Sequence, residues 1–120
     1  MTGGDKIRAE ARGRAWEQRA ALFIPLKGYT IAAHRLRTLV GEIDLVATRG
    51  STMAIVEVKA RANLDQALEA LSPRQRLART AVWLTDSRPV FSAMALRFDL
   101  ILISPLKWLQ HVTDAWQPDN

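Results

Sequence analysis

Residues 41–61 read GEIDLVATRGSTMAIVEVKAR and hold two strand-like runs of Ile, Val, Leu and Ala that meet at a turn signal around Gly50. Each run also carries charged side chains, Asp44 in the first and Glu57 and Lys59 in the second. Because side chains alternate between the two faces of a strand, Glu57 and Lys59 share one face. The stretch therefore predicts two neighbouring antiparallel strands that carry acidic and basic groups within a core-forming sheet.

The rest of the chain predicts a single α/β domain around these two strands. Trp16, Ala20 and Ile24 recur at the helical period and indicate an N-terminal helix, in which Pro25 tightens the last turn. Gly28 then supplies a left-handed stop. Three short strands follow as an antiparallel meander, and helices lead to a further strand that is apolar enough to be buried on both faces. The predicted elements are a helix at 5–27, strands at 29–36, 42–48 and 52–60, helices at 64–71 and 73–86, a strand at 96–103 and an additional edge strand within 107–115.

Composition narrows the classes of protein that the chain can represent. Its 120 residues, 48% hydrophobic and 24% charged, fit one soluble domain over 1–120, with frayed ends at 1–4 and 117–120. The absence of cysteine excludes a disulfide framework, a thiolate nucleophile and a zinc site with Cys ligands. The longest apolar stretch, 20–26, is too short to span a bilayer, and the N-terminus lacks a signal-peptide pattern. We therefore expect a cytoplasmic protein with no membrane partner.

Positive charge is concentrated in the first third of the chain. Residues 1–40 hold eight Lys and Arg against three Asp and Glu, whereas residues 41–120 hold nine of each, so the net charge of +5 comes from the first segment. Such an excess is typical of proteins that bind a phosphate-rich partner, but it also occurs merely for solubility. The candidate nucleic-acid-binding side chains are Arg8, Arg12, Arg19, Arg61, Arg76 and Arg79.

The acidic pair in the two central strands needs a cation if its members approach each other. Two carboxylates at about 4 Å repel by about 4 kcal/mol at an effective dielectric constant of about 20. Lys59 or Arg61 can supply the positive charge, and a divalent ion such as Mg²⁺ can supply it better, because hard cations take oxygen ligands. In the alternative interpretation, the stretch from Glu42 to Lys59 is merely the solvated face of an antiparallel sheet, where Glu-x-Lys is common.

These residues resemble a known family. The Gly-Glu-Ile-Asp-Leu-Val run at 41–46 and the Ile-Val-Glu-Val-Lys-Ala-Arg run at 55–61 are similar to the signature of YraN-like bacterial proteins, which are regarded as predicted endonucleases of the PD-(D/E)xK superfamily. The likeness extends to Gly13 with Glu17, Gly28 with Tyr29, and the Arg-Phe-Asp run at 97–99. It implies a restriction-endonuclease-like core, as in Holliday junction resolvases.

The resemblance also implies an activity, which is metal-dependent hydrolysis of phosphodiester bonds in DNA, with branched or structured DNA as a candidate substrate. Asp44 and Glu57 would hold Mg²⁺ or Mn²⁺, Lys59 would orient a water or stabilise developing charge, and Glu17 would complete the catalytic set. Gln75 matches a helix Gln that some relatives place near the site. Alternatives are a non-catalytic nucleic-acid-binding accessory protein and an RNA-directed nuclease. Fold relatives often act as homodimers, although no stripe in this chain demands one.

Several of these residues have simpler explanations. Glu17 can pair with an Arg of its own helix, and Gln75 fits a capping box that begins at Ser72. Asp99 is expected to pair with Arg97 rather than to bind a metal. The two histidines, His34 and His111, show no ligand spacing. The four tryptophans are expected to pack in the core or at its edge rather than to stack on bases, and these are Trp16, Trp83, Trp108 and Trp116.

Overall fold

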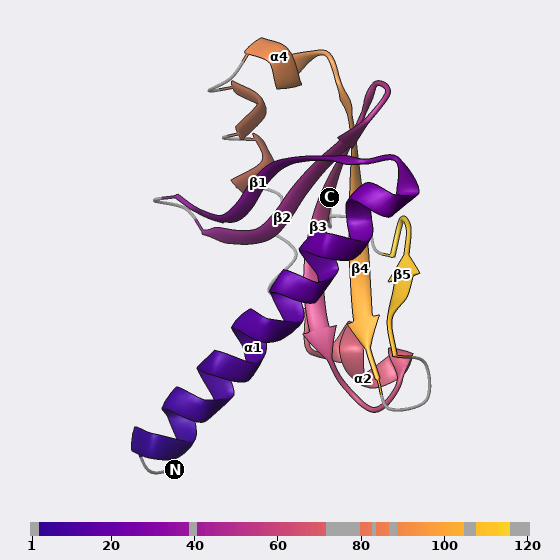
Figure 1. The fold of residues 1–120 in the computed structure, drawn as a ribbon. Helices are drawn as coiled ribbons and strands as arrows, with labels where there is room; N and C mark the ends of the chain where they lie inside the picture. Colours follow the sequence, from indigo (N-terminus) through magenta and orange to yellow (C-terminus); the bar gives the residue numbers. More distant parts are fainter. Residues whose placement is uncertain are drawn as a thin grey trace.

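The computed structural model describes residues 3–38, 41–71, 80–82, 84–86, 89–104 and 108–115, with only the backbone course given within 5–12 (Figure 1). Its five strands form one mixed sheet in the order β1-β2-β3-β4-β5. All neighbours are antiparallel except β3 and β4, which are parallel. The bounds are α1 Gly3–Phe23, η1 Ile24–Lys27, β1 Thr30–Arg37, β2 Glu42–Arg49, β3 Thr52–Ala60, α2 Leu64–Glu69, α4 Pro89–Ser92, β4 Ala95–Ile103 and β5 Gln110–Val112. The predicted α/β class and the antiparallel meander are confirmed.

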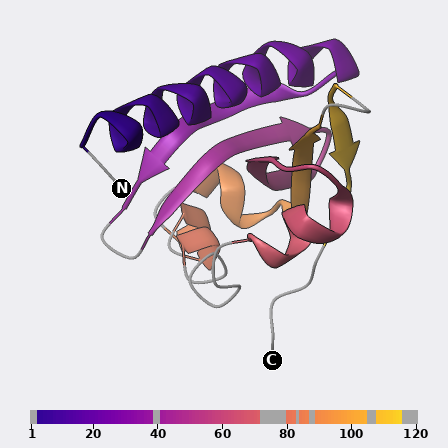
Figure 2. The same cartoon turned by 90° about the horizontal axis from the view of Figure 1, so that it is seen from below.

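The first helix, α1, covers one face of the sheet and forms a separate layer over it (Figure 2). The helix predicted over 5–27 is present, and the tightening of its last turn expected at Pro25 is confirmed. The α-helix stops at Phe23, and Ile24–Lys27 form a 3-10 turn, because Pro25 has no N–H to donate to the helical ladder. Gly28 follows with φ 86°, which is the left-handed stop expected from the sequence.

The core lies on both faces of the sheet. On the face toward α1, Ala20 and Ile24 pack against buried side chains of β2, β3 and β4, which are Leu45, Ala47, Ala54, Val56, Val58, Ile101 and Ile103. The opposite face packs Ile55 against Ala81 and Leu84, from the helical segments 80–82 and 84–86, and against Phe91 of α4. The predicted alternation of β3 between Val56 and Ile55 is therefore confirmed.

The remaining differences from the predicted elements are small. α4 was not predicted, because four residues with one buried side chain, Phe91, are too short for a periodic pattern. α2 ends at Glu69 rather than at residue 71, and the edge strand is only Gln110–Val112. The first part of the helix predicted at 73–86 lies outside the described residues. None of the helices in the described ranges is long and apolar enough to cross a membrane.

Candidate functional site

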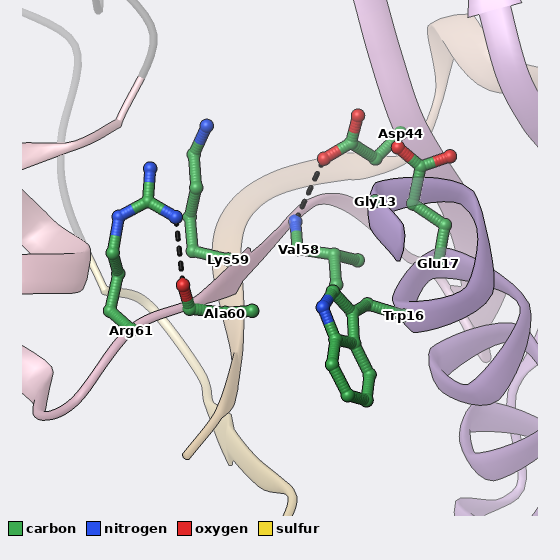
Figure 3. Close-up of a pocket in the computed structure, with 8 residues that line it drawn as sticks. All are labelled: Gly13, Trp16, Glu17, Asp44, Val58, Lys59, Ala60 and Arg61. Atoms are coloured by element: carbon green, nitrogen blue, oxygen red, sulfur yellow. Dashed lines mark hydrogen bonds between the residues drawn. The ribbon is translucent and has the colours of Figure 1, made fainter. Parts of the chain in front are cut away.

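A pocket of about 400 Å³ lies between α1 and the neighbouring strands β2 and β3 (Figure 3). Three of the four residues predicted to be catalytic, Glu17, Asp44 and Lys59, line this one pocket although they are far apart in the sequence. In Figure 3 the carboxylates of Glu17 and Asp44 lie near each other, and the charge of Glu17 acts on Asp44. The lining residues are Gly13, Trp16, Glu17, Asp44, Val58, Lys59, Ala60 and Arg61.

Asp44 lies just beyond the last paired residues of β2 and β3. The ladder ends at the pair Leu45 and Val56, so Asp44 is the first residue of β2 beyond it. The Asp44 Oδ2 accepts a hydrogen bond of 2.8 Å from the backbone N–H of Val58. The carboxylate thus satisfies a main-chain donor of β3 at the point where the ladder has ended, and this bond holds the side chain at the pocket.

The surroundings of Asp44 make its negative charge costly. Burial is the largest effect and raises the pKa of Asp44, while the N–H of Val58 lowers it. The negative charges of Glu17 and Glu57 raise the pKa further, and Lys59 lowers it. The balance of these effects raises the pKa of Asp44 to about 7. The other three residues predicted to be catalytic, Glu17, Glu57 and Lys59, therefore all act electrostatically on the carboxyl group of Asp44.

Glu57 and Lys59 form an ion pair along β3. The Lys59 Nζ lies 3.4 Å from the Glu57 Oε1, and the two side chains are 22% and 8% exposed, respectively. Glu57 does not line the pocket, whereas Lys59 does. The shared face predicted for the two side chains agrees with this contact, and the charge of Glu57 acts on Asp44.

Glu17 pairs with a residue of the sheet rather than with an Arg of its own helix. The Arg35 Nε and a terminal guanidinium nitrogen each lie 3.0 Å from the Glu17 Oε2. Arg35 belongs to β1 and has φ 58°, a left-handed conformation that costs a residue other than glycine about 1–2 kcal/mol. The pair neutralises an acidic side chain at the wall of the pocket and joins α1 to β1.

The donor atoms suit a hard divalent cation that is held only partly by the protein. Within the described ranges, no three His, Cys, Asp or Glu side chains lie close enough together to hold a metal ion by themselves. Mg²⁺ is commonly bound by one or two carboxylates and completes its shell with water and phosphate oxygens. Asp44, which is crowded by the charges of Glu17 and Glu57, is the carboxylate best placed to gain from such an ion.

The central pocket shares lining residues with two other pockets along α1. One, of about 380 Å³, shares Gly13 and Glu17 with the central pocket and adds Arg14, Arg35, Arg37 and Glu42. The other, of about 390 Å³, shares Trp16, Ala60 and Arg61 and adds Ala62, Ile103, Ser104 and Trp108. We call these the basic pocket and the tryptophan pocket. The three adjoining pockets form a groove with arginines at one end, both carboxylates and basic side chains in the middle, and the two tryptophans at the other end.

Comparison with known proteins places the chain in a family. The model of the uncharacterised protein family UPF0102 matches residues 16–103, which include α1 from Trp16 to its end and the strands β1 to β4. The chain belongs to the UPF0102 family. A UPF0102 protein of Parvibaculum lavamentivorans is 52% identical over 104 residues, which cover 85% of this chain and 78% of the relative. A UPF0102 protein of Paramagnetospirillum magneticum is 45% identical over 117 residues, which cover 92% of this chain and 91% of the relative.

The structure describes the side chains of two of the six arginines predicted to bind nucleic acid in this UPF0102 protein. Arg61 lines two of the pockets, and its guanidinium donates to the carbonyl of Ala60. Arg19 lies over the rings of Trp16 and Trp108, with its guanidinium carbon 4.8 and 5.8 Å from the ring centroids. The remaining predictions lie outside the described side chains, and these are Arg8, Arg12, Gln75, Arg76 and Arg79.

Sequence reasoning missed three arginines of the UPF0102 groove, Arg14, Arg35 and Arg37. Arg35 and Arg37 are two residues apart in β1, and that spacing could have marked a basic strand face. The face that they share was not predictable, because the register of β1 shifts between Ile31 and Ala33. The face on which a strand residue lies depends on such a shift.

A second polar cluster lies on the same side of the sheet as α1 and is centred on Asp99 in β4. Arg97 donates to both carboxylate oxygens of Asp99, at 2.8 and 2.7 Å, which confirms the ion pair expected from the sequence. The His111 Nε2 lies 2.8 Å from the Asp99 Oδ2, and the N–H of Asp114 donates to the Oδ1. Burial raises the pKa of Asp99, but these donors outweigh it and lower the pKa to about 2.

The His111 ring links this UPF0102 cluster to the end of the first helix. The Lys27 Nζ lies 2.7 Å from the His111 Nδ1. Because an ammonium group can only donate, Nδ1 accepts, and the proton of the neutral ring is on Nε2, which donates to Asp99. Tyr29 accepts a further hydrogen bond from Arg97. The cluster has its donors and acceptors matched, which indicates a structural role in joining η1, β4 and β5.

Proposed function

We propose that this chain is a nuclease that hydrolyses phosphodiester bonds in DNA, including branched or structured DNA, with the help of Mg²⁺ or Mn²⁺. The observation that carries the proposal is the meeting of Glu17, Asp44 and Lys59 in one pocket, with the charge of Glu57 acting on Asp44. Crowded carboxylates beside an ammonium group are suited to hold a metal ion against a phosphate. The same residues match the PD-(D/E)xK pattern, and we propose that the sheet is a restriction-endonuclease-like core.

Each side chain has a distinct role in the proposed reaction. Asp44 and Glu57 would hold the ion, and Glu17 would reach it through water. The ion would polarise the scissile phosphate and lower the pKa of a bound water. Lys59, partly exposed at the pocket, would donate to the phosphoryl oxygens as negative charge develops on them. The basic pocket, with Arg14, Arg35 and Arg37, would hold the neighbouring phosphates of the strand.

A cleavage assay tests the proposal. Purified protein with Mg²⁺ or Mn²⁺ is offered branched, flapped, single-stranded and duplex DNA, beside RNA. We expect the wild type to cut DNA, and Asp44→Asn and Lys59→Ala each to lower the rate by at least about 100-fold, because each removes a group that acts on the reacting phosphate. Asp65→Asn, an exposed carboxylate change in the first turn of α2, is the matched control and should leave the rate unchanged.

The result that would overturn the nuclease proposal is identical products from the wild type and Asp44→Asn. If the protein cuts only RNA, the proposed metal site still holds, and the substrate is RNA rather than DNA.

A second function, a non-catalytic nucleic-acid-binding accessory protein, is favoured by one observation. Among the described residues no group of three metal-binding side chains forms a ready cage, while the arginines of the basic pocket are in place. An accessory protein would bind DNA without cutting it. In that case Asp44→Asn would bind as tightly as the wild type or more tightly, since a negative charge leaves the groove. Binding measured beside the cleavage assay separates the two functions.

A further inference from the structure

We infer that the tryptophan pocket binds an unstacked nucleobase of the strand whose phosphate lies at Asp44. The identity of this ligand rests on the proposed nucleic-acid function. The pocket has a volume of about 390 Å³ and is lined mainly by apolar groups, with the rings of Trp16 and Trp108 and the side chain of Ile103 among them. Flat aromatic walls around an apolar space suit a flat heteroaromatic ligand, because every base offers a π-face for stacking.

The position of the pocket identifies the ligand as part of a nucleic-acid strand. Trp16, Ala60 and Arg61 line both the tryptophan pocket and the central pocket. A strand with one phosphate at the central pocket can therefore place an adjoining base against the tryptophans without leaving the groove. Arg61 lies at the junction, where its guanidinium can meet the intervening backbone. An apolar ligand without phosphate would use the rings but not this arginine.

The two rings are held in place before any ligand arrives. Arg19 lies within 6 Å of both ring centroids, at 4.8 Å for Trp16 and 5.8 Å for Trp108. Arg19 does not line the pocket, so it supports the rings from outside without filling the space. Cation–π contacts of this kind stabilise aromatic side chains in one orientation. A preformed wall lowers the entropy lost when a base stacks on it.

Trp108 has no role in the core that would explain its position. Its exposed fraction is 64%, so the expectation that it packs at the edge of the core does not hold. A large exposed aromatic side chain beside an apolar pocket is typical of a binding surface. Because the faces of a paired base are covered by its duplex neighbours, the pocket selects strands with an unpaired nucleotide, such as single strands and branch points.

The test measures binding without cleavage, in EDTA, with the full-length protein. The probes are a short single-stranded thymidylate oligonucleotide, the uridylate oligonucleotide of the same length, and a strand of that length in which every nucleotide is abasic. Abasic strands retain the phosphates and lose only the bases. We expect wild-type protein to bind the base-bearing strands about 5- to 150-fold more tightly than the abasic strand.

Variants of Trp108 assign this preference to the pocket. Trp108→Ala should lose most of the preference for bases and keep the wild-type affinity for the abasic strand, whereas Trp108→Phe should retain much of the preference. Leu26→Ala, a change at a highly exposed apolar side chain that lines none of the three pockets, is the control and should behave as wild type. The inference is overturned if the wild type does not distinguish base-bearing from abasic strands, or if Trp108→Ala distinguishes them equally well.

The outcome is distinguishable from that of the proposed function. If cleavage depends on Asp44 but binding does not depend on the bases, the nuclease proposal holds and the base-pocket inference is overturned. If Trp108→Ala loses base-dependent binding but the protein cuts no nucleic acid in Mn²⁺ or Mg²⁺, the base-pocket inference holds and the nuclease proposal is overturned.

Discussion

Asp44 is the residue at which structural and chemical demands conflict. Its carboxylate accepts a hydrogen bond from the backbone of β3, but it is also partly buried and lies near the charges of Glu17 and Glu57. The folded protein therefore resists ionising this group. A residue that raises the free energy of the folded state at neutral pH is expected where a cation is meant to bind, because the ion recovers the lost stability.

This conflict predicts a pH-dependent effect of Asp44→Asn. The pKa of Asp44 is about 7 in the folded protein, above its ordinary value of 3.8. Between these values the folded state holds a proton that the unfolded state has lost, so stability decreases as pH rises through this window. Asparagine does not titrate. In EDTA, Asp44→Asn should therefore be more stable than the wild type by about 4 kcal/mol at pH 8 and show little of this difference near pH 4.

Urea unfolding at the two pH values measures the effect, and adding Mn²⁺ at pH 8 should stabilise the wild type but not the variant. A wild type whose stability relative to Asp44→Asn is the same at both pH values would contradict the raised pKa of Asp44.

Among the secondary-structure elements, β5 is held to the sheet more by side-chain contacts than by its main-chain hydrogen bonds to β4. It has three residues, which pair with Leu100, Ile101 and Leu102 of β4. A strand this short contributes few main-chain hydrogen bonds, whereas the fully buried Asp99 accepts from Arg97 of its own strand and from His111 of β5. The buried cluster therefore holds the edge strand against the sheet and, through the contact between Lys27 and His111, holds the end of η1 nearby.

Asp99→Asn should consequently destabilise the fold by about 3–5 kcal/mol, since it leaves buried donors without their charged partner. The contribution of the carboxylate is present above its ordinary pKa and is lost as pH decreases toward about 2, where the folded-state carboxylate takes up a proton. Chemical denaturation near pH 7 and near pH 2 measures this, with the exposed Asp65→Asn as the control. Equal stability of Asp99→Asn and wild type at pH 7 would show that the cluster does not hold β5.

At the scale of the whole molecule, one groove runs along α1 and changes character from end to end. Arginines lie at one end, the carboxylates and Lys59 in the middle, and the tryptophans at the other end. Figure 2 shows α1 lying over the sheet, and residues of α1 line all three pockets of the groove. A strand laid along the groove would meet groups for its backbone, its scissile phosphate and a base in that order.

The basic end predicts a salt-dependent affinity for nucleic acid. Arg37, whose side chain is 73% exposed and pairs with Glu42 at 3.3 Å, is available to a phosphate. Arg37→Gln should decrease the slope of log affinity against log salt concentration by about 1, because one fewer counterion is released on binding. Arg49→Gln removes the same charge at the opposite end of β2 and should leave the slope unchanged. Equal slopes for wild type and Arg37→Gln would place the strand elsewhere.

Local sequence pattern was sufficient to predict the strands, the first helix and the centre of the site, but not the short helix α4. Alternation along residues 41–61 predicted β2 and β3, and because the two strands are joined by a tight turn, the closeness of Asp44 to Glu57 and Lys59 followed from short-range geometry. The pairing of Glu17 with Arg35 and the joining of Trp16 with Trp108 required the packed fold. These contacts depend on how α1 lies across the sheet and on a register shift in β1. A periodic sequence pattern predicts which side chains share one face of an element, but it does not predict which other element packs against that face.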